Sequence, residues 1–279
     1  IGASALNVQN FTSATDTYNT AVGYYAGVAI TTGVQNTLIG GLAGDAITTA
    51  SYNVALGYAS LSTNTTGAQN TALGTSALGA NTTASYNTAV GFQSMEVTTT
   101  GASNTAVGHS SLIANTTGAY NAAVGSLALD ANTTASYNTT VGWRSMSDTT
   151  TGAANTAVGA DSFRINTTGA NNVAIGYQAL VSNTTAANNV AVGHSALLVN
   201  TTGYLNTAVG ALALDANITG VANTAVGYNA LSAATGDGAT AVGKDALELN
   251  TSGVNTAVGS NALATVTTGT FNVAMGNDA

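Results

Sequence analysis

Few side chains in this sequence suit acid–base, nucleophilic or metal chemistry, and their spacing keeps them apart. The two histidines, His109 and His194, occupy the same position of a repeated motif but lie five repeats apart, and there is no cysteine. A metal centre needs several ligands around one ion, which this distribution does not supply. Serine and aspartate never recur with histidine at matching positions, so a hydrolytic triad has no support. The sequence therefore predicts no enzyme, no metal and no cofactor.

Two other motifs resemble functional signatures but have a simpler explanation as turns. The glycine-rich phrases lack the Gly-Lys-Ser/Thr that completes a phosphate-binding loop, and calcium-binding β-rolls need regular aspartates. Several Asn-Thr-Thr triplets match the N-glycosylation sequon. Asparagine and glycine also favour turns, so we expect these triplets to be turns without glycans. The triplets begin at Asn64, Asn81, Asn115, Asn132, Asn166, Asn183 and Asn200.

Charged side chains are rare and mostly acidic, which excludes several classes of partner. Only 5% of the residues are charged, and the net charge of −8 includes just three basic residues. Nucleic-acid binding requires a basic surface for the phosphates, so we expect no nucleic-acid partner. No long apolar run occurs, so we also expect no membrane insertion in this segment.

These residues lie within a repeat that covers nearly the whole sequence. A glycine closes the motif Asn-Thr-Ala-Val-Gly every 17 residues from Gly23 onward, with two steps of 16 residues that end at Gly243 and Gly259. A fixed period of this length indicates a solenoid, in which each unit packs only against its neighbours. We number positions from this glycine, which is position 0, so that the consensus runs from Asn at −4 to Gly at +10.

The residue types favour strands over helices. Threonine, valine, asparagine and glycine disfavour helices, and a 17-residue unit cannot hold the two helices of common helical repeats. We expect two short strands per repeat, one at positions −3 to −1 and one around Ala-Leu at +3 and +4, separated by turns at position 0 and at Asn-Thr-Thr-Gly. The predicted fold is all-β, a parallel β-roll or β-helix solenoid of about 16 coils.

The repeat predicts one continuous domain. Residues 1–22 are expected to form an irregular first coil with an insertion, and residues 23–279 to form the solenoid, uncapped at both ends. Solenoids normally hide their open ends under capping units. The absence of such units from this sequence favours either a fragment of a longer protein or end-to-end stacking.

Hydrophobicity and charge suggest which positions are buried. Nearly all charged residues fall at +1, +2, +5 or +6, as Arg164 does at +5, so these positions are expected to face solvent. Position −1 is always apolar, and we expect it, with Val158 as an example, to form a buried row. Both faces of the strand are apolar, which indicates a cover on each side. Small residues at −2 and +3 would let a neighbouring chain approach closely. We therefore expect a homo-oligomer, with a trimer as the leading form and an alanine-rich monomer as the alternative.

Asparagine at −4 and glycine at 0 are expected to have structural roles. Stacked asparagine side chains can hydrogen-bond to the same side chain in the coils above and below, and glycine permits an unusual backbone at the turn. The asparagines of this predicted ladder include Asn36, Asn70, Asn104, Asn138, Asn172 and Asn206, and the glycines include Gly40, Gly74, Gly108, Gly142, Gly176 and Gly210.

The phrase Asn-Thr-Ala-Val-Gly-x-x-Ala-Leu resembles the left-handed parallel β-roll repeats in the heads of trimeric autotransporter adhesins. The full unit, as in residues 206–220, is similar to repeats of phage tail-fibre-like proteins. The resemblance covers nearly the whole chain. It implies a left-handed, homotrimeric fibre, located outside the cell, at the cell surface or on a virion, that often serves for attachment.

Aromatic residues at +1 are the candidate binding residues. Rings on an exposed face can stack on sugars or pack against a partner, so we expect a structural fibre segment that presents an attachment surface, with a cell-surface glycan or receptor as the partner. The alternatives are a self-assembling extracellular filament, and an ice-binding solenoid that would use ranks of threonine at +8 and +9. The candidate aromatic residues are Tyr24, Tyr58, Phe92, Trp143, Tyr177 and Tyr228.

Overall fold

A computed structural model of the protein describes residues 2–9 and 16–279. The chain divides into two compact units, Ile1–Asn138 (unit 1) and Thr139–Ala279 (unit 2), and each is a parallel β-solenoid. The insertion expected within residues 1–22 overlaps residues 10–15 and lies outside the described residues.

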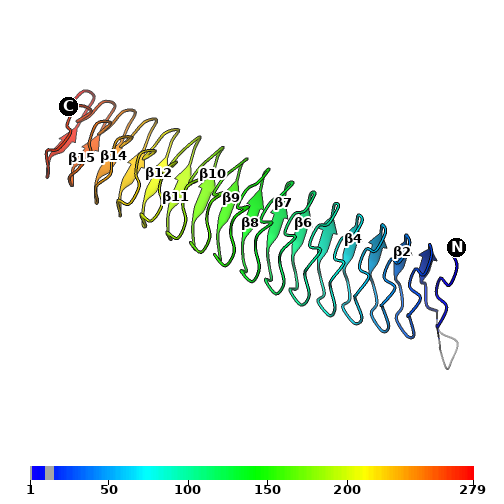
Figure 1. The fold of residues 1–279 in the computed structure, drawn as a ribbon. Coiled ribbons are helices and arrows are strands. Elements are labelled where there is room, and N and C mark those ends of the chain that lie inside the picture. Colours follow the sequence, from blue (N-terminus) through cyan, green and yellow to red (C-terminus); the bar gives the residue numbers. More distant parts are fainter. Residues whose placement is uncertain (1, 10–15) are drawn as a thin grey trace. The chain divides into compact units, whose positions relative to one another are not determined.

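Each coil contributes one strand of three residues at positions −3 to −1, and in each unit the strands stack in sequence order (Figure 1). In unit 1 they are β1 (Thr20–Val22), β2 (Thr37–Ile39), β3 (Val54–Leu56), β4 (Thr71–Leu73), β5 (Thr88–Val90), β6 (Thr105–Val107) and β7 (Ala122–Val124). In unit 2 they are β8 (Thr139–Val141), β9 (Thr156–Val158), β10 (Val173–Ile175), β11 (Val190–Val192), β12 (Thr207–Val209), β13 (Thr224–Val226), β14 (Thr240–Val242), β15 (Thr256–Val258) and β16 (Val273–Met275).

Parallel pairing keeps every repeat position in line with the same position of the next coil. In unit 1, for example, Ala72 of β4 pairs with Ala89 of β5. The two shortened coils keep this alignment, since Thr224 pairs with Thr240 and Thr240 pairs with Thr256 although each step is 16 residues. The missing residue is therefore taken from a turn and not from a strand.

The prediction of a second strand around +3 and +4 is wrong. The structure has turns there, because the backbone is left-handed at +2 and +4 of each coil, as at Ser76 (φ 56°) and Leu78 (φ 51°). Leucine rarely adopts this conformation, so the local backbone is held by hydrogen bonds between coils. The N–H of Leu78, for example, donates to the carbonyl of Ser94 in the next coil at 3.1 Å.

Position 0 requires glycine for two separate reasons. Gly40 has a φ of +137°, which side chains disfavour, and a Cβ atom there would lie 2.3 Å from the carbonyl oxygen of Gly57 in the next coil. The following residue, Gly41, has neither restriction, because a Cβ there would meet only the Tyr58 side chain at 3.5 Å.

The interior is lined by positions −2, +3 and +4 together with asparagine at −4 and +7, and the expectation that −1 points inward is wrong. Ala157, at −2, is fully buried, whereas Val158, at −1, is 36% exposed. Successive residues of a strand point to opposite faces, and the narrow interior accepts alanine opposite the larger side chain at +4. The small residues at −2 and +3 thus face the coil interior and not a neighbouring chain. Arg164 at +5 is partly exposed, as expected, and pairs with Asp161 at 3.6 Å.

Coils that depart from the consensus confirm that −2 and +4 share the interior. Leu38 occupies −2 where most coils have alanine, and the two +4 positions beside it are Gly27 and Gly44 instead of a large residue. A Cβ atom built on Gly27 or Gly44 would lie 2.7 or 2.8 Å from the Leu38 side chain. The large side chain therefore comes from −2 instead of +4 in this part of the solenoid, and the volume that fills the interior is conserved.

Buried asparagines at −4 form a hydrogen-bonded ladder along each unit. The Nδ2 of Asn53 donates to the Oδ1 of Asn36 at 3.2 Å, and the backbone N–H of Asn53 donates to the same oxygen at 3.0 Å. Nδ2 also donates to the carbonyl of Gly67 at position +10 of its own coil, at 3.1 Å. Unit 2 repeats the arrangement, with Asn172 donating to Asn155 at 3.2 Å. Each amide joins two coils and closes its own, so buried polar groups are satisfied.

A second ladder at +7 is made by the asparagines of the Asn-Thr-Thr triplets. Asn81 donates from Nδ2 to Oδ1 of Asn64 at 2.9 Å, and Asn132 donates likewise to Asn115 at 2.8 Å. Thr98 occupies +7 between Asn81 and Asn115. Within the described chain, the Oδ1 of Asn81 and the Oγ1 of Thr98 are buried without a hydrogen-bond partner. The ladder in unit 1 is therefore interrupted at Thr98.

Candidate functional site: the aromatic row at position +1

The aromatic side chains expected at +1 lie on the surface, directly after the glycine that turns the chain away from the strand. All six rings are about half exposed, from 48% for Phe92 and Tyr177 to 58% for Tyr24 and Tyr58. In unit 1 they occupy every second coil, at Tyr24, Tyr58 and Phe92. With a coil rise of about 4.8 Å, these ring positions repeat roughly every 10 Å.

Two of these rings stack on a histidine in the next coil. Phe92 and His109 have ring centroids 5.6 Å apart with planes at 14°, and Tyr177 and His194 have the same separation with planes at 25°. Stacking explains why the histidines share a position, which motif spacing alone did not. Within the part of the chain that the structure describes, no cluster of three metal-ligating side chains occurs.

A side-chain amide follows each stacked ring and was not identified from the sequence. Gln93 follows Phe92 and Gln178 follows Tyr177, and both are partly exposed at +2. The constellation of aromatic ring, glutamine and histidine thus occurs once in each unit. The sequence signal was the recurrence of Phe-Gln or Tyr-Gln, with Gly-His in the following repeat, five repeats later.

The neighbours of the stacked pairs are small or uncharged. Thr75 and Ser126 flank the pair in unit 1, while Ala160 and Ala211 flank the pair in unit 2. The nearest charge at +1 or +2 in unit 2 is Asp161, which pairs with Arg144 at 3.7 Å and with Arg164 at 3.6 Å. The outer ring faces of both pairs are therefore not covered by large side chains at +1.

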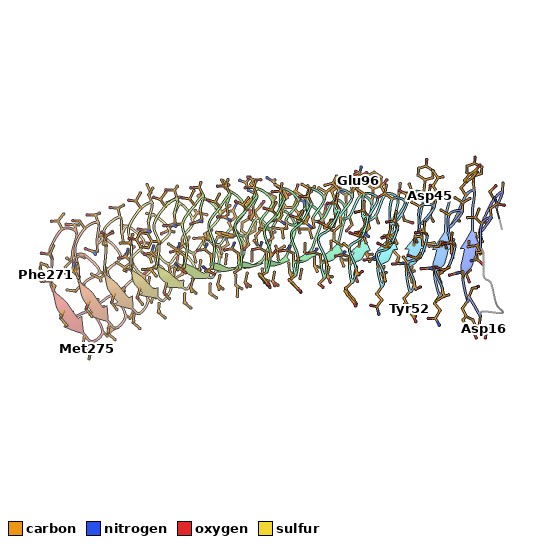
Figure 2. The ribbon with its side chains drawn as sticks, turned by 90° about the horizontal axis from the view of Figure 1, so that it is seen from below. Asp16, Asp45, Tyr52, Glu96, Phe271 and Met275 are labelled. Carbon is orange, nitrogen blue, oxygen red and sulfur yellow. The ribbon has the colours of Figure 1, made fainter. Side chains whose placement is uncertain are left out.

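A second set of aromatic side chains lies at −5, on a different edge of the coil. Figure 2 shows Tyr52 of this set on one edge of unit 1, with Asp45 and Glu96 on the opposite edge. Tyr120 and Tyr137 stack with their centroids 5.2 Å apart and their planes at 6°. The set consists of Tyr18, Tyr52, Tyr86, Tyr120, Tyr137 and Phe271, and all six side chains are exposed.

Local contacts shift the pKa values of three aspartate carboxyls. Burial raises the pKa of the Asp45 carboxyl above its ordinary value, partly offset by backbone N–H groups, and the same causes raise the pKa of Asp215. Lys244 lies 2.6 Å from Asp245, and its hydrogen bond lowers the pKa of that carboxyl. Each of these pKa shifts thus has a local structural cause.

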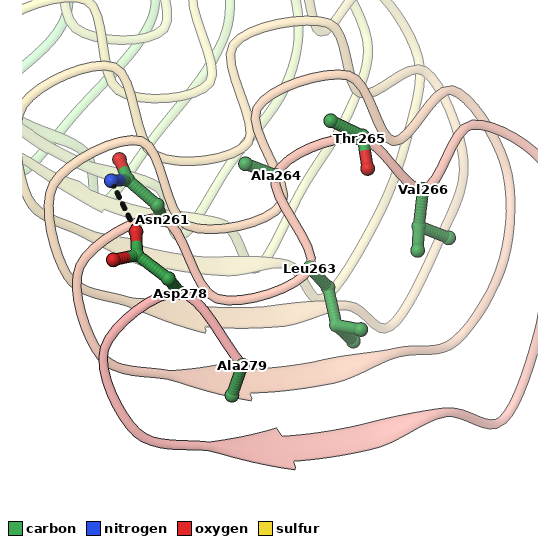
Figure 3. Close-up of a pocket in the computed structure, with 7 residues that line it drawn as sticks. All are labelled: Asn261, Leu263, Ala264, Thr265, Val266, Asp278 and Ala279. Atoms are coloured by element: carbon green, nitrogen blue, oxygen red, sulfur yellow. Dashed lines mark hydrogen bonds between the residues drawn. The ribbon is translucent and has the colours of Figure 1, made fainter.

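One cavity of unit 2 does not provide a binding site with converging polar groups. It has a volume of about 420 Å³ and lies at the last coil of unit 2 (Figure 3). Leu263 and Val266, which line it, occupy the interior positions +4 and +7. Asn261 donates to Asp278 at 2.7 Å, so the polar groups of its wall bind each other. A second hollow, of about 330 Å³, lies over Gly79 in unit 1, with Glu96 as its only charged lining residue.

The asparagines of the Asn-Thr-Thr triplets are fully buried in the +7 ladder. Their amide nitrogens are enclosed by the neighbouring coils, so an enzyme cannot reach them in the folded protein. The triplets are turns, and their asparagines stabilise the interior.

No family model matches the sequence, and a search of curated proteins returned no match. Among the residues that the structure describes, no helix is long and apolar enough to cross a membrane.

Proposed function

We propose that the chain is a segment of an extracellular or virion-borne fibre that assembles with itself as a homotrimer and presents an attachment surface. The proposal rests on the outer strand face, which we define as the side chains at −3 and −1 of β1–β7 in unit 1 and of β8–β16 in unit 2. At −1, Ile39, Leu56 and Ile175 are 37%, 45% and 39% exposed.

The outer strand face has the character of a covered surface. No charged residue occupies −3 or −1 in any described strand. Parallel sheets occur almost only with both faces covered, and contiguous exposed apolar patches on soluble proteins mark interaction sites. The interior of the coil covers one face of each sheet. A second copy of the same chain is the simplest cover for the other, and three copies are what the resemblance to adhesin heads and tail fibres implies.

Sedimentation equilibrium on the whole chain tests the assembly. We expect a particle of three times 27.1 kDa, and a monomer at all accessible concentrations would remove the proposal. Leu56→Lys and Ile175→Lys place a charge on the outer strand face of each unit and should dissociate the trimer. The matched control is Thr66→Lys at the exposed position +9, which should leave the mass unchanged.

A second candidate function, binding to ice, is supported by the threonines at −3. Consecutive strands of unit 1 carry Thr71, Thr88 and Thr105 at this position, in a flat rank with spacings of about 4.8 Å. The expected rank at +8 is less suitable, because these hydroxyls are used internally, as when Thr65 donates to the carbonyl of Thr82 at 3.1 Å. Thermal hysteresis that is lost in Thr88→Tyr would support ice binding, and its absence from the parent protein would exclude it.

A further inference from the structure

We propose that the two stacked ring pairs are equivalent binding sites for the pyranose rings of a neutral glycan. The first site consists of Phe92, Gln93 and His109 in unit 1. The second consists of Tyr177, Gln178 and His194 in unit 2. This inference deepens the proposed attachment role, and it rests on that role for its biological meaning.

The aromatic ring supplies the apolar part of the recognition. Phe92 and Tyr177 are each 48% exposed although they are large and aromatic, and stacking on histidine holds each ring in a fixed orientation at 5.6 Å. One face of each ring meets the histidine, and the opposite face lies toward Thr75 in unit 1 or Ala160 in unit 2. A pyranose ring has a flat face of C–H groups that packs well on such a surface.

The glutamine supplies the polar part. An amide offers two donors and one acceptor oxygen, which matches sugar hydroxyls that both donate and accept. The side chains of Gln93 and Gln178 make no hydrogen bond within the described chain. Their backbones are fixed, since the N–H of Gln93 donates to Thr75 at 3.0 Å and that of Gln178 donates to Ala160 at 3.2 Å. Each amide thus belongs to the residue directly after its ring and is free to bind a ligand.

The surrounding charge selects a neutral ligand. In unit 1 the +1 and +2 positions from Thr75 to Leu127 carry no carboxylate and no lysine or arginine. In unit 2 the only carboxylate among the corresponding positions, Asp161, is paired with two arginines. A nucleic-acid strand could also stack on the rings, but it needs basic side chains for its phosphates, which the site lacks. At the first site an acidic or basic glycan would find no opposite charge at these positions.

The duplication argues that the constellation is a unit and not a coincidence. In both units a backbone hydrogen bond joins the residue after the histidine to the aromatic residue of the preceding coil. The N–H of Ser110 donates to the carbonyl of Phe92 at 2.9 Å, and the N–H of Ser195 donates to the carbonyl of Tyr177 at 3.0 Å. The aromatic ring and the imidazole therefore stack at the same centroid separation in both units, with a glutamine at the same position of the repeat.

Isothermal titration calorimetry with cellohexaose, chitohexaose and mannohexaose tests the proposal, with polygalacturonate as the charged comparison. We expect at least one neutral oligosaccharide to bind at two sites per chain. Phe92→Ala or Tyr177→Ala should each leave one site, and the double variant should leave none. Gln93→Leu should weaken the first site about tenfold, which corresponds to roughly 1.4 kcal/mol.

The matched control is Tyr86→Ala, which removes another exposed aromatic ring of unit 1, at −5, and should leave both sites. Thermal melts of each variant would check that it is folded. Failure of all three neutral oligosaccharides to bind in the millimolar range would overturn the inference, as would binding that survives in the double variant or is lost in Tyr86→Ala. Sedimentation of the same samples reports the trimer separately, so either proposal can fail alone.

Discussion

Replacing Thr98 with asparagine should stabilise the protein by completing the interrupted ladder of unit 1. The new amide would donate from Nδ2 to the Oδ1 of Asn81, which now has no partner within the described chain, as Asn81 donates to Asn64 at 2.9 Å. It would also accept from the Nδ2 of Asn115, which now donates only to the carbonyl of Gly118, at 3.0 Å. Each hydrogen bond contributes about 1 kcal/mol, so the free energy of unfolding should rise by about 2 kcal/mol.

At roughly 2.1 cal/mol/K of unfolding entropy per residue, this gain raises the Tm by about 3 °C, measured by circular dichroism. The control is Thr99→Asn, one residue later, because the Oγ1 of Thr99 already donates to the carbonyl of Thr116 at 3.2 Å. That variant breaks a hydrogen bond and should lower the Tm. An unchanged or lower Tm for Thr98→Asn would refute the view that the ladder is limited by its missing amide.

Three further predictions concern the turn, the interior and the charge of the coil. Gly40→Ala should unfold or strongly destabilise unit 1, because its Cβ would lie 2.3 Å from a carbonyl oxygen, while Gly41→Ala should change the Tm little; equal melts would contradict the turn geometry. Leu38→Ala should cost about 2–5 kcal/mol in denaturant unfolding, and adding Gly44→Leu should restore part of it; two strictly additive losses would show that the side chains do not share space. Asp45→Asn should raise the Tm at neutral pH and have no effect below the ordinary pKa of 3.8. The reason is that burial raises the pKa of this carboxyl in the folded state, so the protein gains stability as the pH falls through that pKa. A higher Tm of the variant that persists at low pH would exclude this cause.

The period of the sequence predicted the parallel stack and the asparagine ladder, because each coil of a solenoid packs against its neighbours with the same positions in line. Which face of the strand is buried could not be read from Ala157 and Val158, since both are apolar. The decisive signal was in the exceptions: Leu38 at −2 coincides with Gly27 and Gly44 at +4, and such compensation means shared space. Compensating changes in side-chain size at two positions therefore indicate that both face the interior more clearly than their average hydrophobicity does.

The second strand was predicted wrongly because residue types do not reveal the backbone there. Leu78 and Met95 have φ values near +51°, a conformation that most side chains avoid, and only hydrogen bonds to the next coil maintain it. The aromatic row was predicted to be exposed because charged residues also occur at +1, whereas the proposed role of Gln93 and Gln178 required the stacking of Phe92 on His109 to be seen first.

The shortened coils of unit 2 show that the strands stay aligned even when the number of residues per coil changes. Thr224, Thr240 and Thr256 remain aligned although a residue is missing from each intervening coil, and the Asp237 carboxylate accepts the N–H of Val221 at 2.8 Å. In unit 1 the Ser85 hydroxyl accepts the N–H of Ala68 in the same way. Since this corner can lose a residue, we expect it also to accept inserted ones, at the small entropic cost of a longer surface loop. The corner between +8 and −5 is thus a place where new peptide can be grafted and displayed, coil by coil, without altering the strands that hold it.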